Sequence, residues 1–326
     1  MKYARDVLEL VGNTPLVRLN AVTAGLKATV LAKLEFMNPG GSVKDRIGIS
    51  MIEDAEKKGL LKPGGTIVEP TSGNTGTGLA LAAALRGYRC VFTMPDKMSI
   101  EKEQLLKAFG AEVIRTPTDV PPDDDRSYYR VAERIVRERK NAFSPNQYAN
   151  RSNPAAHYRT TGPEIWRDTD GKVTHFVAGM GTGGTISGTA RYLKEKNQGV
   201  RVVGADPAGS LFHGRFHGEK EVVHPYKTEG IGEDFMPETM DLSLIDDVIQ
   251  VSDRQAFAMA RRLVREEGLL AGGSSGAAVH AAVEAVRGLG GDALVVVLLP
   301  DSGRAYLSRI FNDGWMREQG FLQEMP

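Results

Sequence analysis

Short apolar runs alternate with helical patterns along most of this 326-residue chain. The runs that begin at Thr66, Arg89 and Ala111 have the composition of strands, and helical segments separate them. The same rhythm returns in the second half of the chain. Strands are expected over 66–69, 89–94, 111–115, 174–178, 201–205, 247–251 and 293–299, and helices over 78–86 and 99–109 and from Thr185, Asp253 and Ser275 onward. Such an alternation predicts an α/β fold in which crossover helices connect parallel strands.

One apolar run indicates how deeply the second sheet is buried. Residues 293–299 are all apolar, and Pro300 stops the run. A run without polar alternation suits a strand that is buried on both faces. Segments 116–125 and 207–229 break the pattern, and the longer of them is a candidate lid or substrate loop. The sequence predicts two α/β halves that meet near residue 150 and bind ligands at the carboxyl ends of their strands.

Charge and cysteine content narrow the classes of function. Lys+Arg and Asp+Glu both number 41, so the formal net charge gives no electrostatic argument for a nucleic-acid or anionic-membrane partner. Cys90 is the only cysteine, which fits a reducing compartment. The N-terminus lacks a signal-peptide apolar stretch, and no run approaches the ~20 apolar residues that span a bilayer. We expect a soluble, cytoplasmic protein.

The first motif with chemical meaning is the segment 38–46, which contains Lys44. Helical spacing begins directly after it, so Lys44 lies near a helix N-terminus. The helix dipole there disfavours a cation and lowers the pKa of the amine. A lysine that gives up its proton is what a Schiff base to an aldehyde cofactor requires. The alternative is an ordinary surface lysine on a first helical turn.

The second motif, residues 69–76, follows a predicted strand and opens a helix. Backbone N–H groups at such a turn, with the hydroxyls of Thr71, Ser72 and Thr75, form a pocket for an anion such as an amino-acid carboxylate. The Asn74 amide could hydrogen-bond a cofactor oxygen. The alternative is an ordinary helix cap, since these residue types cap helices in most proteins.

The third motif is a glycine-rich loop over 179–185, after another predicted strand. Glycines let the backbone approach an oxyanion, and the following helix points its positive end at it, so the loop suits a phosphate. Gly179, Gly181 and Gly184 also satisfy the dinucleotide pattern, with Asp206 at the expected distance. A nicotinamide-dependent oxidoreductase therefore stays open as an alternative.

Two further features are weaker. The segment 272–276, which contains Ser274, precedes an alanine-rich helical run and could equally be a flexible turn. His213, His217 and His224 share the irregular segment, but no cysteine is nearby and their spacing matches no strong ligand pattern. We therefore expect no metal site.

Together these motifs resemble the fold-type II pyridoxal-phosphate enzymes of the cystathionine β-synthase/cysteine synthase family. The resemblance runs in the same order over nearly the whole chain, beginning at Gly12-Asn13-Thr14-Pro15-Leu16. It implies two parallel-sheet α/β domains of the tryptophan synthase β-like architecture, with the active site between them. We expect a smaller domain over 47–150 and a larger, cofactor-binding domain over 1–46 and 151–326.

The resemblance also implies a role for each motif residue. Lys44 would be the catalytic lysine that binds pyridoxal 5'-phosphate as a Schiff base, and Asn74 would bond the phenolic oxygen of the cofactor. Ser274 would face the pyridine nitrogen. The phosphate would lie in the loop Gly181, Thr182, Gly183, Gly184 and Thr185, and the substrate would contact Thr71, Ser72, Gly73, Thr75, Gln147 and Tyr148.

Within the family, the segments 229–235 and 299–306 look closer to the cystathionine β-synthase branch. The expected reaction is β-replacement on L-serine with L-homocysteine, and the expected assembly is a homodimer. A cysteine synthase that uses O-acetylserine and sulfide is the alternative within the family. Many relatives carry regulatory domains or a haem segment, and we expect neither a haem nor a regulatory-domain response here.

Overall fold

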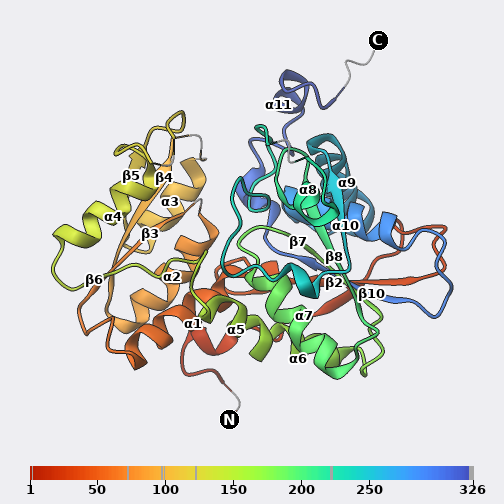
Figure 1. The fold of residues 1–326 in the computed structure, drawn as a ribbon, viewed down its shortest axis with the longest axis horizontal. Coiled ribbons are helices and arrows are strands. Elements are labelled where there is room, and N and C mark those ends of the chain that lie inside the picture. Colours follow the sequence, from red (N-terminus) through yellow and green to blue (C-terminus); the bar gives the residue numbers. More distant parts are fainter. Residues whose placement is uncertain are drawn as a thin grey trace.

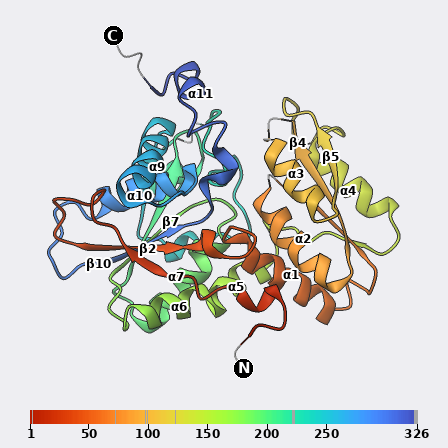
Figure 2. The same cartoon turned by 180° about the vertical axis from the view of Figure 1, so that it is seen from behind.

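The structure is a computed structural model that describes residues 1, 3–71, 73–96, 98, 100–121, 123–220 and 223–322. Within these ranges the chain forms two sheets with helices packed against them (Figures 1 and 2). Both sheets consist mainly of parallel strands. The expected α/β architecture with two parallel sheets is therefore confirmed.

The larger sheet draws its strands from both ends of the sequence. Its order is β1 (Leu16–Arg18), β2 (Thr29–Leu34), β10 (Leu294–Leu299), β7 (His175–Gly179), β8 (Arg201–Pro207) and β9 (Asp247–Val251). Only the edge strand β1 runs antiparallel to its neighbour. The parallel pairing of β2 with β10 places the segment before Lys44 beside the segment that follows β10.

The smaller sheet lies entirely within the first half of the chain. Its order is β5 (Glu112–Thr116), β4 (Arg89–Pro95), β3 (Thr66–Pro70) and β6 (Ala142–Phe143), with all pairs parallel. These four strands fall inside the range 47–150 proposed for the smaller domain. The domain boundaries themselves stay a prediction.

Eleven α-helices are assigned within the described residues. They are α1 (Lys44–Lys57), α2 (Asn74–Arg86), α3 (Ile100–Ala108), α4 (Tyr128–Glu138), α5 (Ser152–Arg159), α6 (Thr161–Asp168), α7 (Gly184–Lys196), α8 (Phe212–His217), α9 (Asp253–Glu267), α10 (Gly273–Ala285) and α11 (Asp313–Glu318). Short 3-10 helices cover Val7–Leu10, Glu35–Met37, Leu242–Leu244 and Gly303–Tyr306. None of the described helices has the length and apolar character to cross a membrane.

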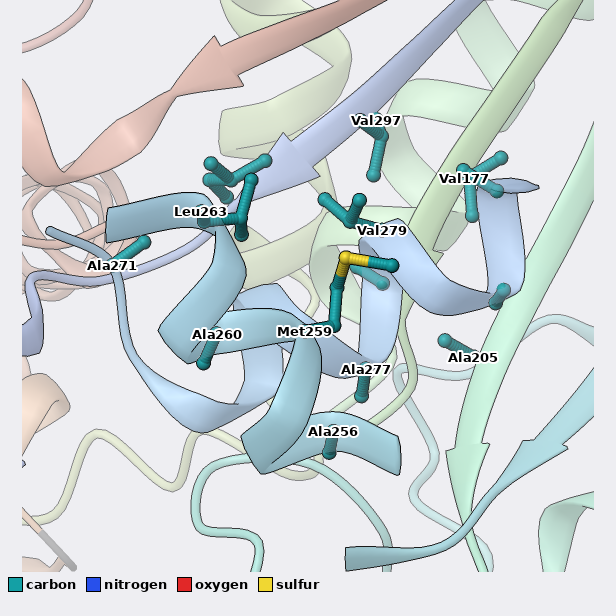
Figure 3. Close-up of a cluster of buried hydrophobic side chains, with 14 of the residues drawn as sticks. Val177, Ala205, Ala256, Met259, Ala260, Leu263, Ala271, Ala277, Val279 and Val297 are labelled. Carbon is teal, nitrogen blue, oxygen red and sulfur yellow. The ribbon is translucent and has the colours of Figure 1, made fainter. Parts of the chain in front are cut away.

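The strand β10 is buried on both faces, as its apolar run predicts. Val295 and Val297 belong to one core cluster with α9 and α10, whereas Val296 and Leu298 belong to a second cluster with α7. Successive side chains of a strand point to opposite faces, so an unbroken apolar run can serve two cores. Figure 3 shows the first cluster, in which residues of α9 and α10 pack toward Val297 and its neighbours.

The segment 207–229 differs from its prediction as an irregular loop, because it contains α8. The Asp206 carboxylate accepts a hydrogen bond from the His213 N–H at 2.9 Å, which satisfies a backbone donor in the first turn of this short helix. Histidine and glycine, which are frequent in this segment, are weak helix formers. Its sequence therefore did not predict a helix that depends on a contact with Asp206.

Candidate active site

The predicted site residues follow the carboxyl ends of strands from both sheets. β3 ends at Pro70, directly ahead of Thr71 and Asn74. β7 ends at Gly179, shortly before the glycine loop 181–185, and β10 ends at Leu299. Ligands of parallel sheets bind beyond these strand ends, so the fold gives the motifs the location that a shared site requires.

The start of α2 is held against Lys44 by the close crossing of α1 and α2. A Cβ at Gly48 would lie 2.4 Å from the Gly78 carbonyl carbon, and a Cβ at Gly78 would lie 2.5 Å from the Lys44 carbonyl oxygen. Only glycine at both positions lets the two helix backbones approach this closely. The crossing brings the helix that begins at Asn74 to the same place as Lys44.

The Lys44 amine has the electrostatic character that the sequence predicts. Its pKa lies below the ordinary value of lysine, chiefly because burial removes the charged form from water, while Asp301 and Glu233 raise it. Among the described residues, no hydrogen bond or ion pair engages the Lys44 side chain. The direction of the shift agrees with the prediction, but its main cause is burial rather than the helix dipole.

The turn after β3 is closed by the Thr71 hydroxyl. Thr71 Oγ1 accepts hydrogen bonds from the N–H groups of Gly73 at 3.1 Å and of Gly76 at 3.3 Å. Thr71 is buried, and as an acceptor in these bonds its hydroxyl retains a hydrogen to donate. Ser72 lies outside the described residues, so its predicted role in substrate binding stays a prediction.

Gln147 lies beside Thr75, although 72 residues separate them in the sequence. The Thr75 hydroxyl donates to Gln147 Oε1 at 2.6 Å, and both residues are buried. The backbone of the Gln147 segment is fixed by Glu69, whose carboxylate accepts the N–H groups of Asn146 at 2.9 Å and Gln147 at 3.0 Å. Burial raises the pKa of Glu69 to about 7.

Tyr148, which follows Gln147 in the chain, contacts residues of the second half of the chain. Its ring contacts Phe235 edge-on, with 5.1 Å between the ring centroids. Its phenol pairs with the Glu233 carboxylate, and burial together with that negative charge raises the pKa of Tyr148 well above its usual value. Tyr148 therefore connects its own segment, which contains Gln147, to Glu233, the carboxylate that also raises the pKa of Lys44.

The glycine loop is joined to Gln147 through Asn153. The Asn153 amide donates to the Gln147 carbonyl oxygen at 2.8 Å and to Thr182 Oγ1 at 3.2 Å. A Cβ at Gly184 would lie 1.8 Å from Asn153 Oδ1, so no larger residue fits there without movement. Gly183 precedes the first turn of α7, which directs its backbone N–H groups toward the loop.

A buried histidine supports the other end of the glycine loop. His157 Nε2 is 3.2 Å from Thr185 Oγ1, and His157 Nδ1 is 2.9 Å from Thr161 Oγ1. Burial, reinforced by the Arg46 charge, lowers the pKa of His157 to about 3, so the ring is neutral at neutral pH. This histidine was not among the predicted site residues.

Ser274 is the second residue of α10 and is buried. Its hydroxyl has no hydrogen-bond partner among the described residues. The preceding Gly272 donates its N–H to the Asp301 carbonyl oxygen at 3.1 Å, which ties the start of α10 to the segment after β10. Ser274 is thereby held near the strand end that also carries Asp301.

Asp301 is the residue that the sequence analysis missed as part of the site. It is buried, and its Oδ2 accepts hydrogen bonds from Asn74 Nδ2 at 2.8 Å and from the Tyr306 hydroxyl at 2.6 Å. An aspartate directly after the end of a buried parallel strand was the available indication. Apart from that position, the segment 299–306 distinguishes branches of the family but carries no local sign of a site residue.

The donor groups fit pyridoxal phosphate. Lys44 offers an amine of lowered pKa without a partner among the described residues. The glycine loop before α7 offers backbone N–H groups and hydroxyls of the kind that bind a phosphate. The Asn74 amide and the Ser274 hydroxyl offer neutral polar groups for an oxygen and a nitrogen of the ring. We expect these residues to hold the cofactor.

The alternative site predictions find less support. Asp206, which would bind a ribose in a dinucleotide fold, is fully buried and bonds the His213 N–H instead. His217 contacts the Val248 carbonyl oxygen at 3.1 Å, and His224 contacts that of Pro225. Within the described ranges, no group of three or more His, Cys, Asp or Glu residues could hold a metal ion.

Comparison with known proteins identifies the family. A family model described as "Pyridoxal-phosphate dependent enzyme" matches residues 7–301. The chain is 51% identical over 325 residues to a cystathionine beta-synthase of Oryctolagus cuniculus, covering 99% of this chain and 59% of that protein. It is 48% identical over 324 residues to a cystathionine beta-synthase of Apis mellifera, covering 99% and 64%. The chain thus spans only 59% to 64% of the length of these relatives.

A solved structure supports the same assignment over its full length. The crystal structure of a hydrogen sulfide-producing enzyme from Fusobacterium nucleatum matches with a TM-score of 0.87 and 42% sequence identity. The match covers 94% of this chain and 100% of that one. The dinucleotide hypothesis explains neither the Lys44 motif nor the Thr71 motif, so the family assignment replaces it. The chain belongs to the family of pyridoxal-phosphate dependent enzymes, and its cofactor is pyridoxal 5'-phosphate.

Proposed function

We propose that this protein catalyses β-replacement on L-serine with L-homocysteine, giving L-cystathionine and water. The observation that carries the proposal is Lys44, a buried amine of lowered pKa whose backbone lies against Gly78 of α2, the helix that begins with Asn74 and Thr75. The similarity to cystathionine beta-synthases at 51% and 48% identity supports the choice of substrates. In this reaction the serine hydroxyl leaves the β-carbon and the thiol sulfur takes its place.

Lys44 has two tasks in this proposal, since it anchors the cofactor and then moves a proton. Bound pyridoxal phosphate supplies an electron sink for the charge that develops at the α-carbon. The Lys44 amine, once free, removes the α-proton and returns it after the thiol has added. A lowered pKa suits both steps, because it keeps a larger fraction of the amine neutral near pH 7.

The residues around Lys44 orient the substrate and the cofactor. The Thr71 hydroxyl, the Thr75 backbone N–H and the Gln147 amide nitrogen bind the amino-acid carboxylate, joined by Ser72, Gly73 and Tyr148. The loop Gly181, Thr182, Gly183, Gly184 and Thr185 binds the phosphate at the positive end of α7, and Asn74 bonds the phenolic oxygen. Ser274 faces the ring nitrogen, and a hydroxyl there fixes less positive charge than a carboxylate, which favours elimination over transamination.

A negative charge near Tyr148 supports an amino-acid thiol as the second substrate. The Glu233 carboxylate pairs with the Tyr148 phenol and also acts on Lys44. A carboxylate at this position attracts the ammonium group of homocysteine and repels a hydrosulfide anion. Homocysteine is therefore the better match to these charges.

A second candidate function involves sulfide. The matched solved structure is of a hydrogen sulfide-producing enzyme, and 42% identity over that whole chain makes similar chemistry a specific alternative. A cysteine synthase that joins O-acetylserine and sulfide would use the same Lys44 and the same glycine loop. The two candidates differ in the thiol rather than in the cofactor.

The proposal also includes a homodimer in the cytoplasm. The homodimer rests on the resemblance to the family, and a single buried cysteine, Cys90, is compatible with a reducing compartment. Light scattering of the purified protein measures the assembly directly, and a monomeric mass at micromolar concentration would contradict the dimer.

Competing thiols provide the test of the proposed reaction. The loaded enzyme is given L-serine with either homocysteine or sulfide, and then O-acetylserine with the same two thiols, and products are identified by mass spectrometry. We expect the highest kcat/KM for the pair of serine and homocysteine, with cystathionine as product. Faster turnover of O-acetylserine with sulfide would replace this proposal with the cysteine synthase function.

A further inference from the structure

The carboxylate of Asp301 lies between a residue expected to touch the cofactor and a tyrosine of its own segment. Its Oδ2 accepts from Asn74 Nδ2 at 2.8 Å and from the Tyr306 hydroxyl at 2.6 Å. Its Oδ1 is buried and has no hydrogen-bond partner in the described part of the chain. Asp301 itself is 3% exposed. Burying a carboxylate with an unsatisfied oxygen is costly for stability, which makes a purely structural role a poor explanation.

A carboxylate determines which way the Asn74 amide faces. The two ends of an asparagine amide have the same shape, but only the nitrogen end can donate. An ionised carboxylate accepts hydrogen bonds and cannot donate, so Asp301 requires the Asn74 nitrogen on its side. The amide of a residue expected to contact the cofactor is thereby held in one of its two orientations.

Asp301 also acts on the Lys44 nitrogen. Two negative charges raise the pKa of Lys44, and Asp301 has a larger effect than Glu233. The backbone holds the two segments together, since Ser42 and Asp301 form an antiparallel bridge and the Val43 N–H donates to Pro300 at 2.8 Å. The distance between the Asp301 and Lys44 backbones is therefore fixed by strand geometry rather than by flexible side chains.

The groups around Asp301 act in opposite directions on its charge. Burial raises its pKa above the ordinary aspartate value, whereas the Tyr306 hydroxyl, the Asn74 amide and the Lys102 charge lower it, and Glu229 raises it. The Lys102 amine lies 4.9 Å from the centroid of the Tyr306 ring. Two hydrogen-bond donors and a cation thus favour the ionised form in a site that otherwise disfavours it.

We propose that Asp301 is a positioning residue of the cofactor site, which fixes the Asn74 amide and stabilises positive charge on the Lys44 nitrogen. The inference rests on the proposed roles of Asn74 and Lys44 toward pyridoxal phosphate. It requires no assumption about the thiol or the leaving group. Its test therefore uses the loaded enzyme without either substrate.

The Asp301→Asn variant separates charge from packing, because asparagine has nearly the same shape. We expect its dissociation constant for pyridoxal phosphate to rise about tenfold, because an amide at position 301 can donate as well as accept and no longer fixes the orientation of the Asn74 amide. We also expect its visible cofactor band to be lost at a pH about one unit below that of the parent enzyme, as the neighbouring negative charge is gone. A merely structural role would lower the melting temperature without moving this pH.

Two further variants complete the experiment. Tyr306→Phe removes a donor from the same carboxylate, so Asp301 ionises less readily and the band should shift in the same direction by a smaller amount. This variant serves as the test if Asp301→Asn does not fold. Asp170→Asn removes one exposed negative charge elsewhere and should leave both measurements unchanged. The inference would be overturned if Asp301→Asn changed neither the affinity for pyridoxal phosphate nor the pH at which the band is lost. The same criterion applies to Tyr306→Phe where that variant is the test.

Discussion

The Thr75 hydroxyl and the Gln147 side chain meet at 2.6 Å, which joins the first turn of α2 to the segment that follows β6. Glu69, at the end of β3, holds the backbone of that segment through two N–H groups. The two residues proposed to bind the substrate carboxylate are thus oriented by each other and by a shared strand. Preorganisation of this kind lowers the entropic cost of binding a small anion.

Substitution of Thr75 by valine tests this pair. Valine keeps the shape but removes the donor, which leaves the buried Gln147 oxygen without its partner. We expect KM for serine to rise about tenfold, because Gln147 is no longer held in its carboxylate-binding orientation, with a smaller change in kcat. If the double variant with Gln147→Ala loses the sum of the two single effects, the residues act independently and the pairing has no role.

Gly184→Ala tests the fit of the glycine loop. The added Cβ would lie 1.8 Å from Asn153 Oδ1, so the loop or Asn153 must move. We expect the affinity for pyridoxal phosphate to fall more than tenfold, because the displaced N–H groups no longer converge on the phosphate. Gly290→Ala is the matched control, since a Cβ there meets no atom within 4 Å. Equal affinities in the two variants would contradict the phosphate role of the loop.

The buried His157 predicts a specific pH dependence of stability. Its pKa is about 3 in the folded protein and 6.5 in the ordinary state. Between pH 3 and pH 6.5 the unfolded chain binds more protons at this residue than the folded protein does. The free energy of unfolding is therefore not reduced by His157 above pH 6.5 and falls as the pH is lowered below that value. The stability advantage of the parent apoenzyme over His157→Gln should shrink by about 2 kcal/mol between pH 7 and pH 5. Urea denaturation at both pH values measures it, and a constant difference would rule the mechanism out.

Glu233→Gln tests the selection of the thiol. Removing the negative charge should weaken the use of homocysteine, whose ammonium group it attracts, and should favour hydrosulfide. We expect the ratio of kcat/KM for homocysteine to that for sulfide to fall about tenfold in this variant. Asp234→Asn is a useful control, because that side chain is exposed and adjacent. A ratio that stays constant in Glu233→Gln would remove Glu233 from substrate recognition.

The sequence predicts well the elements whose local composition agrees with their burial. β10 begins one residue later than expected and ends at its expected residue, because its unbroken apolar run reflects burial on both faces. α9 also begins at its expected residue, Asp253, where Ser252 forms a capping box with Gln255. In these segments local chemistry and tertiary packing favour the same structure.

Three features were not predicted from the sequence, and two of them depend on distant partners. β2 contains Lys33, a charged residue that a strand prediction disfavours, yet its amine is fully buried against Glu164 at 2.8 Å. α4 was also missed, although Val131, Ala132 and Ile135 have helical spacing and are buried. The Asp301–Asn74 contact joins residues 227 positions apart, which no local pattern reports.

The absorption spectrum of the loaded protein tests the central claim most directly. The parent enzyme should show a visible band that shifts on addition of L-serine and returns when homocysteine is added. The folded Lys44→Ala variant should lack the covalently attached cofactor after borohydride reduction and should show no turnover. A band that responds to O-acetylserine but not to serine would change the proposed substrates. A covalent adduct retained in Lys44→Ala, or the absence of any visible band in the parent with added pyridoxal phosphate, would contradict the account.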